Sequence, residues 1–300
     1  MMVYTETRGA GRIRKHYRVY TYRKDGKVVH RRVYLGAGIS GKELRRREKL
    51  ADARLIHPLN ALLTGNERAL LSEIRGKHLA KHPATFENRY EVFASEFTHD
   101  STGIEGNTLT LRETAAVLFE GASPSKSLRE VYEVLNHKKA FDYILNYKGG
   151  VTKGFLCELQ RIVTENTLKH AIAGQAGRYR DVPVFIRGAD ITPPPAEIVP
   201  HEMKSLLSWY GKNRKKLHPV VLAAYLHSAF EAIHPFADGN GRTGRLLLNF
   251  VLHRNGYPMV SIPRSQRIMY FGVLAAAQKG NLKPFIGFLI RLLKRTEKSI

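Results

Sequence analysis

The segment that decides the fold is His234-Pro235-Phe236-Ala237-Asp238-Gly239-Asn240-Gly241-Arg242-Thr243-Gly244-Arg245. It places one imidazole, one carboxylate, a Gly-Asn-Gly turn and two guanidinium groups close together in the chain. The apolar run 246–252 that follows is typical of a helix, so the turn should lie at a helix N-terminus. Free backbone N–H groups and the helix dipole favour an anion there. These residue types suit a nucleotide polyphosphate with a metal ion, beside a hydroxyl group that is to be activated.

His234 should end an apolar helix over 220–233, because the residue before a proline is pushed out of helical geometry. We therefore expect its side chain to face the following loop. An imidazole with a pKa of about 6.5 can remove a proton from a hydroxyl group near neutral pH. Asp238 lies nearby and can ligate Mg²⁺, which takes one or two carboxylates together with phosphate oxygens.

The turn and the two arginines complete the predicted anion site. Gly239, Asn240 and Gly241 allow a sharp turn in which backbone N–H groups converge on an anion. Arg242 and Arg245 share a helix face, and their guanidinium groups match phosphate oxygens. An ordinary surface turn with solvated arginines would explain the glycines, but not the clustering of imidazole, carboxylate and guanidinium groups.

Length and composition indicate a globular protein that is not exported. The chain has 300 residues, of which 43% are hydrophobic, so it suits one large domain or one domain with an appendage. No apolar run approaches the roughly 20 residues of a membrane helix, and no signal-peptide core opens the chain. Cys157 is the only cysteine, which excludes an internal disulfide. We expect a cytoplasmic protein without a membrane partner.

Residues 1–60 are predicted to form a basic N-terminal region. Residues 1–55 carry 16 Lys and Arg against 5 Asp and Glu, and the whole chain has a net charge of +23. Residues 12–35 predict a β-hairpin, since two runs of β-branched and aromatic residues flank an Asp-Gly turn. A helical pattern follows from Gly41, and residues 61–83 indicate a connecting helical segment.

Residues 84–300 are predicted to form a mainly α core of helices joined by short Gly and Pro loops. The exception is 177–195, where proline-fixed extended backbone predicts a short hairpin or flap. The helices expected after residue 99 cover 110–119, 127–147, 153–168, 200–213, 218–232, 242–255, 264–279 and 283–295.

The segment 234–245 resembles the signature of the Fic family, His-Pro-Phe-x-Asp/Glu-Gly-Asn-Gly-Arg-x-x-Arg, at every fixed position. Its flanks, 226–233 and 255–258, are similar too. The similarity runs from about residue 84 to 290, although Gln160 stands where many members have a histidine. The resemblance implies a helical Fic core with a short β-hairpin flap, here preceded by the small basic N-terminal region.

The same resemblance implies a protein adenylyltransferase, which transfers AMP from ATP to a Ser, Thr or Tyr hydroxyl of a target protein. His234 would act as the general base, and Asp238 would bind Mg²⁺ that bridges the α- and β-phosphates. The turn 239–241 would cradle the phosphates, Arg242 would stabilise the leaving pyrophosphate, and Arg245 would hold the γ-phosphate. Positioning and electrostatics would supply most of the rate.

A second motif bears on regulation. Ser101-Thr102-Gly103-Ile104-Glu105-Gly106-Asn107 resembles the family's inhibitory pattern, Ser/Thr-x-x-x-Glu-Gly/Asn, on a helix expected near 95–106. By that resemblance Glu105 pairs with Arg245 in the place of the γ-phosphate, so that a carboxylate and a phosphate compete for one guanidinium group. A helix cap is the plainer explanation of Ser101 and Glu105. The full signature downstream favours the regulatory one.

The predicted flap concerns the target protein. By the same resemblance its edge, Val184, Phe185 and Ile186, aligns the target segment by strand addition, in which main-chain hydrogen bonds give the affinity. The alternative is an ordinary surface hairpin.

Two other functions stay open on the sequence alone. The same site could remove AMP from a modified protein, with Glu105 positioning a water molecule. The basic N-terminal region could bind nucleic acid, because Tyr17, Tyr20, Tyr22 and Tyr34 are interleaved among arginines. Those tyrosines could equally pack against one another. The sequence also leaves open whether the chain forms a homodimer.

Overall fold

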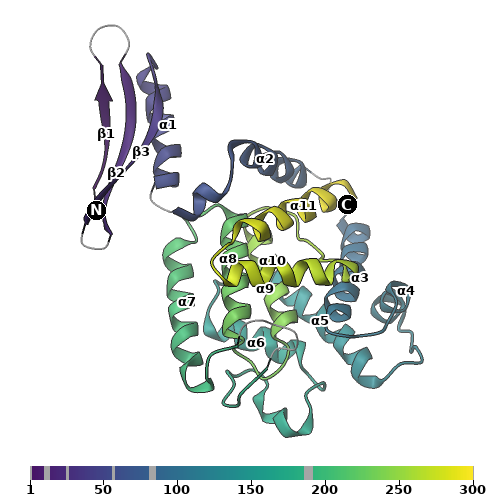
Figure 1. The fold of residues 1–300 in the computed structure, drawn as a ribbon. Coiled ribbons are helices and arrows are strands. Elements are labelled where there is room, and N and C mark those ends of the chain that lie inside the picture. Colours follow the sequence, from purple (N-terminus) through teal and green to yellow (C-terminus); the bar gives the residue numbers. More distant parts are fainter. Residues whose placement is uncertain are drawn as a thin grey trace.

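The structure is a computed structural model in which helices dominate and one small antiparallel sheet lies at the N-terminal end (Figure 1). This confirms the predicted fold class. The described residues are 2–9, 14–24, 27–55, 58–80, 86–185 and 192–299. Among the described helices, none has the length and apolar character needed to cross a membrane.

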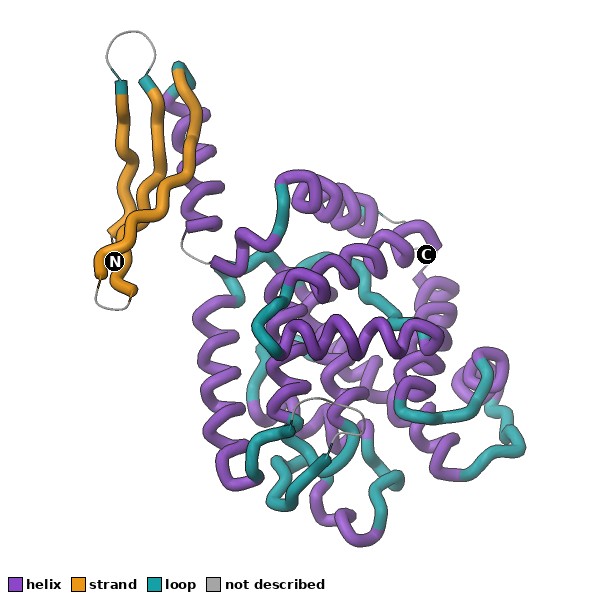
Figure 2. The backbone as a smooth tube through the Cα atoms, viewed as in Figure 1, coloured by secondary structure: helices purple, strands orange, loops and turns teal. Residues whose placement is uncertain are grey.

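The N-terminal sheet has three strands in the order β1-β2-β3, namely Met2–Arg8, Lys15–Lys24 and Lys27–Ala37. The predicted hairpin is therefore present as β2 and β3, while its Asp25-Gly26 turn lies outside the described residues. Strand β1 was not predicted, because it is short and precedes the longer aromatic runs. Helix α1, Gly41–Leu55, packs beside the sheet, which stands apart from the helical body (Figure 2).

A short connection joins this N-terminal unit to the core. The 3-10 helix η1, Pro58–Leu62, leads into α2, Gly65–Leu79. Thr64 caps α2 in a reciprocal arrangement, since its side chain accepts from the N–H of Glu67, whose carboxylate accepts from the N–H of Thr64. The helical pattern expected from Gly41 is present as α1, and the connecting helical segment expected over 61–83 contains α2.

The core is built around two adjacent helices, α8 (Pro219–Ile233) and α9 (Asn240–Arg254), whose side chains are buried on nearly every face. Helices α7, α10 and α11 pack around α8, and α3, α5 and α6 pack around α9 (Figure 1). The bounds are α3 Phe86–Ile104, α4 Leu111–Ala115, α5 Leu128–Asn146, α6 Lys153–Val163, α7 Val199–Asn213, α10 Arg267–Gln278 and α11 Lys283–Ser299. A π-helical turn, Ala116–Glu120, continues α4, and single 3-10 turns cover His170–Gln175, Ala196–Ile198 and Arg264–Gln266.

The expected flap has no strand within its described part, 177–185 and 192–195. Ile186 of the predicted edge lies outside the described residues. Val184 and Phe185 lie in irregular backbone next to Pro183, which cannot donate a ladder hydrogen bond.

Replacing Asn60 with Ala should weaken the attachment of η1 to the core. Its Nδ2 donates to the carbonyl oxygen of Lys216 at 2.8 Å, and its Oδ1 accepts from the N–H of His218 at 2.9 Å. Because the variant leaves both backbone groups without this partner, we expect the free energy of unfolding to fall by about 1–3 kcal/mol. Urea denaturation measures this, with exposed Asn146→Ala as the control. Equal changes in the two variants would contradict the prediction.

Candidate functional site

The predicted site residues meet where α8 ends and α9 begins. The helix ends at Ile233, as the sequence predicts, and His234 adopts a left-handed backbone conformation with φ of 51°. Its side chain is 20% exposed, and its Nδ1 lies 3.4 Å from the carbonyl oxygen of Glu231. With Nδ1 donating to that carbonyl, Nε2 is left to accept a proton.

Burial sets the protonation states of two neighbouring groups. It lowers the pKa of His234 to about 4, against the opposing effect of the hydrogen bond to the carbonyl of Glu231. It also raises the pKa of the Glu231 carboxyl to about 8, against the opposing charge of Arg245. At neutral pH the imidazole is therefore neutral, and Glu231 is largely protonated.

Asn240 shapes the loop between the two helices. Its Oδ1 accepts from the N–H of Phe236 at 2.9 Å, and its Nδ2 donates to the carbonyl oxygen of Phe236 at 2.8 Å. Gln160 holds the same loop from α6, because its side chain donates to the carbonyl of Asp238 and accepts from the N–H of Gly177. The side chain of Asn240 thus braces the loop, and Gln160, noted only as a departure from the family pattern, is a missed member of the site.

Gly239 is the N-cap of α9 and adopts a left-handed conformation that favours glycine. Its φ is 79°, and a Cβ there would lie 2.7 Å from Cγ2 of Thr164. The first turn of α9 then presents backbone N–H groups that no earlier carbonyl of the helix can accept. The helix N-terminus is therefore available to an anion, as the sequence predicts.

Two buried arginines line this end of α9. The side chains of Arg242 and Arg245 are 3% and 2% exposed. Arg242 lies 3.4 Å from Asp238 and 3.8 Å from Glu133, between the nearest nitrogen and oxygen atoms. Nε and Nη1 of Arg242 and Nη1 of Arg245 are buried without a hydrogen-bond partner among the described residues. Because unpaired buried donors are costly, this arrangement suits a bound anion.

The carboxylate of Glu105 lies at this anion site. Its Oε1 accepts from Nη2 of Arg245 at 2.8 Å. Ser101 accepts two further hydrogen bonds from Arg245, at Oγ (3.0 Å) and at its carbonyl oxygen (2.8 Å). A Cβ on Gly241 would lie 2.2 Å from Oε1 of Glu105, so the carboxylate rests directly against the first turn of α9. The structure therefore brings together both residues of the predicted inhibitory motif and the second arginine of the signature.

Glu105 is held as an anion in this position. Burial would raise the pKa of its carboxyl, but the charge and the hydrogen bond of Arg245 together lower that pKa below its usual value. Its side chain is 38% exposed, whereas that of Arg245 is buried. Glu105 lies in the turn just after α3, which begins earlier than the helix expected near 95–106 and ends at Ile104.

Asp238 is the candidate metal ligand. Its side chain is 31% exposed and lies between Arg242 and Arg129, whose Nη2 is 3.7 Å from Oδ2. Over the described ranges, no three His, Cys, Asp or Glu side chains gather in a metal-binding group. A single carboxylate fits Mg²⁺ that arrives with a nucleotide, because phosphate oxygens and waters supply its other ligands.

Arg180 ties the flap segment to His234. Its side chain is buried; Nε donates to the carbonyl oxygen of His234 at 2.8 Å, and Nη2 donates to that of Pro194 at 2.6 Å. Arg180 was not predicted as a site residue, since an arginine in a loop carries no sequence signal of burial. Phe185, on the predicted edge, is 87% exposed.

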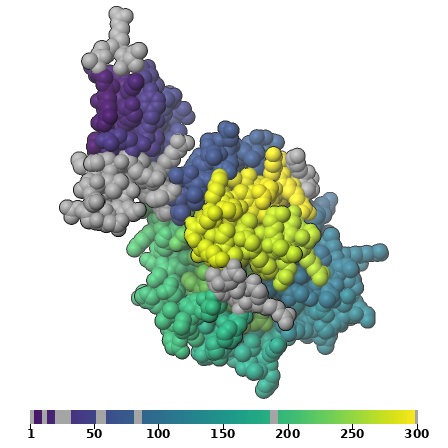
Figure 3. Space-filling model, in the orientation of Figure 1, coloured from purple at the N-terminus to yellow at the C-terminus, as the bar shows by residue number. Residues whose placement is uncertain are grey.

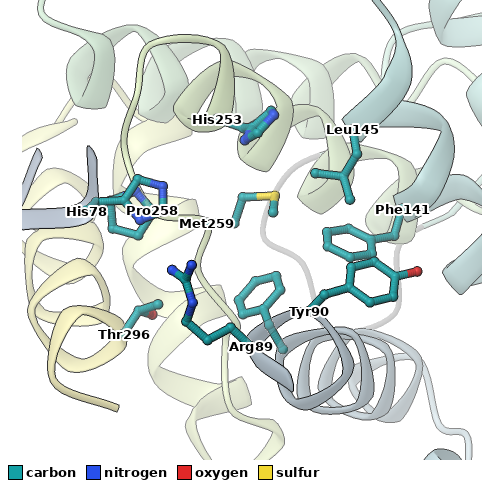
Figure 4. A pocket seen from close by; sticks show the side chains of 10 residues that line it. His78, Arg89, Tyr90, Phe141, Leu145, His253, Pro258, Met259 and Thr296 are labelled. Carbon is teal, nitrogen blue, oxygen red and sulfur yellow. The ribbon is translucent and has the colours of Figure 1, made fainter. Parts of the chain in front are cut away.

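A separate cavity of about 260 Å³ lies among α2, α3, α5, α11 and the segment after α9 (Figure 4). Arg89 and His253 lie on its wall beside mainly aromatic and aliphatic side chains. These are Tyr90, Phe93, Phe141, Leu145, Pro258 and Met259. No predicted site residue lines this cavity, so we place the chemistry at the loop between α8 and α9.

Comparisons with known proteins identify relatives of this chain. A model of the Fic/DOC family matches residues 150–252. The chain is 39% identical over 212 residues to a protein adenylyltransferase Fic of Nematostella vectensis, covering 69% of this chain and 48% of that protein. It spans about half the length of the curated relatives that it matches.

Solved structures show the same fold. The crystal structure of a Fic domain containing signaling protein from Bacteroides thetaiotaomicron superposes with a TM-score of 0.70 at 31% identity. That match covers 78% of this chain and 95% of the other. A Fic family protein from Desulfovibrio desulfuricans gives a TM-score of 0.68 at 31% identity, covering 79% and 74% of the two chains.

Replacing Glu231 with Gln should reduce the loss of stability at high pH. The raised pKa of about 8 means that the folded state holds the proton more tightly than the unfolded chain, where the value is near 4.5. The stabilisation from this proton is complete below about pH 4.5 and is lost as the pH rises toward 8.

Urea unfolding from about pH 5 to about pH 9 tests this, and the Gln variant should lose less stability than the native chain over that interval. Exposed Glu73→Gln is the control and should follow the native chain. An unchanged pH dependence in Glu231→Gln would show that this carboxyl is ionised in the folded protein.

Replacing Arg180 with Lys should lower the free energy of unfolding by about 1–3 kcal/mol, because an ammonium group cannot reach all the carbonyls that the guanidinium joins. Arg178→Lys is the matched control, since Arg178 is 55% exposed. Denaturant titration of both variants measures the difference. A loss in Arg178→Lys as large as that in Arg180→Lys would argue against the buried linkage.

Proposed function

Because the chain belongs to the Fic/DOC family, we propose that it transfers AMP from ATP to a hydroxyl group of a target protein and that Glu105 inhibits this transfer. The observation that carries the proposal is the Glu105 carboxylate, which rests on the first turn of α9 and on Arg245. A carboxylate held there marks the position as an anion site. The same contact would inhibit the transfer, because Glu105 occupies Arg245.

The proposed nucleotide site uses the features that favour an anion. The backbone of Gly239, Asn240 and Gly241 faces the phosphates at the N-terminus of α9, and Asn240 keeps the loop in shape from within. Arg242 offers buried N–H groups without partners to the phosphates that leave as pyrophosphate. Asp238 would hold Mg²⁺, which neutralises phosphate charge when bound.

His234 is the proposed general base. The target hydroxyl oxygen attacks the α-phosphorus of ATP, and the bond from that phosphorus to the oxygen bridging the β-phosphorus breaks. Pyrophosphate leaves with that bridging oxygen, and the hydroxyl proton passes to Nε2 of His234. The imidazole is suited to this step because burial keeps it neutral and the Glu231 carbonyl orients Nδ1.

The flap is the proposed docking edge for the target. Val184 and Phe185 precede Ile186 in the chain, and Phe185 exposes most of its ring. Arg180 joins this segment to His234 through backbone carbonyls. A target segment bound along this edge by main-chain hydrogen bonds would therefore present its hydroxyl group near the base.

Labelling with ATP that carries its label on the α-phosphate tests the proposal. The native chain should take up little label, whereas Glu105→Gly should label itself or an added protein strongly, because Arg245 is then available to the γ-phosphate. Glu105→Gly combined with His234→Ala should lose this label. Equal labelling of the native chain and Glu105→Gly would remove the inhibitory role, and labelling that survives His234→Ala would remove the general base. Release of AMP from a premodified target by the native chain alone would favour the reverse reaction.

The pH dependence of Glu105→Gly should reflect the buried imidazole. Because burial lowers the pKa of His234 to about 4, the base stays unprotonated through neutral pH, and kcat/KM should fall only on acidification toward that value. A profile that is half lost near pH 6.5, the ordinary value for histidine, would show a solvated imidazole and contradict the assigned environment. Initial rates across buffers of constant ionic strength give the profile.

A further inference from the structure

The N-terminal sheet has two unlike faces, which follow from its register. Thr5 pairs with Arg18, and Arg18 pairs with Val33, so these three residues share one face. The neighbouring set, Tyr4, Val19 and Arg32, is likewise in register and shares the opposite face, because successive side chains in a strand alternate. We call the face of Tyr4, Val19 and Arg32 the open face.

Helix α1 covers the other face. Glu48 of α1 accepts a hydrogen bond from Thr5 and lies 3.7 Å from Arg18. Arg47 of α1 donates to the carbonyl oxygen of Leu35, and Leu35 is buried. One face of the sheet is therefore occupied within the N-terminal unit.

The open face is positively charged, and exposed side chains lie on either side of Val19, which is itself buried. The side chains of Arg8 and Arg32 are 55% and 42% exposed. Both guanidinium groups form ion pairs with the same acidic residue, Glu6. Two guanidinium groups against one carboxylate leave this cluster with net positive charge. Lys15, paired in register with Arg8, adds another exposed cation at the same end of the sheet.

The rest of the N-terminal region is also basic. The whole segment 1–55 carries 16 Lys and Arg against 5 Asp and Glu. The excess of positive charge therefore belongs to the region as a whole and is not confined to the cluster around Glu6.

We infer that the open face binds duplex DNA, a function independent of the proposed AMP transfer. Three strands at a spacing of about 4.8 Å give roughly 10 Å between the outer strands. The major groove of B-form DNA is about 12 Å wide and its minor groove about 6 Å wide, so this face matches the major groove in width. The deep, narrow major groove of A-form RNA is closed to side chains. Arginines along the strands would contact phosphates on the groove walls.

The aromatic rings on this face differ in exposure. Tyr17 and Tyr34 lie with ring centroids 5.3 Å apart, and the guanidinium carbon of Arg8 lies 5.7 Å from the Tyr17 ring centroid. Tyr17 therefore packs against side chains of its own sheet, whereas Tyr34 is 55% exposed and Tyr4 37% exposed. Because exposed rings can stack on unpaired bases, single-stranded DNA is the competitor that tests the choice of a duplex. Figure 3 shows the N-terminal unit projecting from the helical core.

Fluorescence anisotropy of the full chain with a labelled random-sequence DNA duplex, over a series of salt concentrations, tests this inference. Affinity should fall linearly on a double-logarithmic plot against salt. Arg8→Gln with Arg32→Gln keeps hydrogen-bonding groups beside Glu6 but removes two charges. It should weaken binding and make the salt slope shallower by about 1.8, since each phosphate contact contributes about 0.9.

Lys42→Gln with Lys49→Gln is the matched control, because it removes two exposed charges from α1 and leaves the open face intact. It should bind like the native chain, and thermal unfolding of both double variants verifies that they remain folded. Equal weakening in the two double variants would reduce the effect to net charge and overturn the inference. So would salt-independent binding, or single-stranded DNA or duplex RNA that competes better than duplex DNA.

Discussion

The site depends on how the buried guanidinium group of Arg245 is neutralised. Arg245 is 2% exposed and gains Ser101 and Glu105 as partners, although α3 and α9 lie far apart in the chain. Removing one partner of a buried charge pair costs several kcal/mol because the other charge stays unpaired. The arginine therefore needs an anion, which can be the chain's own carboxylate or a phosphate from a ligand. The proposed inhibition and the proposed AMP transfer both depend on this requirement.

Three side chains hold the loop between α8 and α9 in place. Asn240 closes the loop from within, Gln160 holds it from α6, and Arg180 fixes the carbonyl of His234. These three side chains hold the loop that positions the imidazole and the N-terminus of α9. Under the proposed function, a nucleotide would therefore bind to groups that are already oriented.

The sequence predicted those features of the site that depend only on residues close together in the chain. The proline after His234 placed the end of α8, and the glycine-rich turn placed the start of α9. The pairing of Glu105 with Arg245 required the family resemblance, because no local rule relates such distant residues. Glu231, Gln160 and Arg180 were missed, since burial creates their roles and burial depends on the packed core. Strand β1 was missed because its pairing with β2, and not a pattern in its own short sequence, identifies it as a strand.

The central claim is that Glu105 and the γ-phosphate of ATP compete for Arg245. The most direct test compares the affinities of ATP and ADP, by calorimetry, for the native chain and for Glu105→Ala. In the native chain the γ-phosphate should add little affinity. In the variant it should gain a charge-assisted hydrogen bond, about 1.5–3 kcal/mol, so ATP should bind roughly 10- to 100-fold tighter than ADP. The same ATP-to-ADP ratio in both proteins would contradict the account.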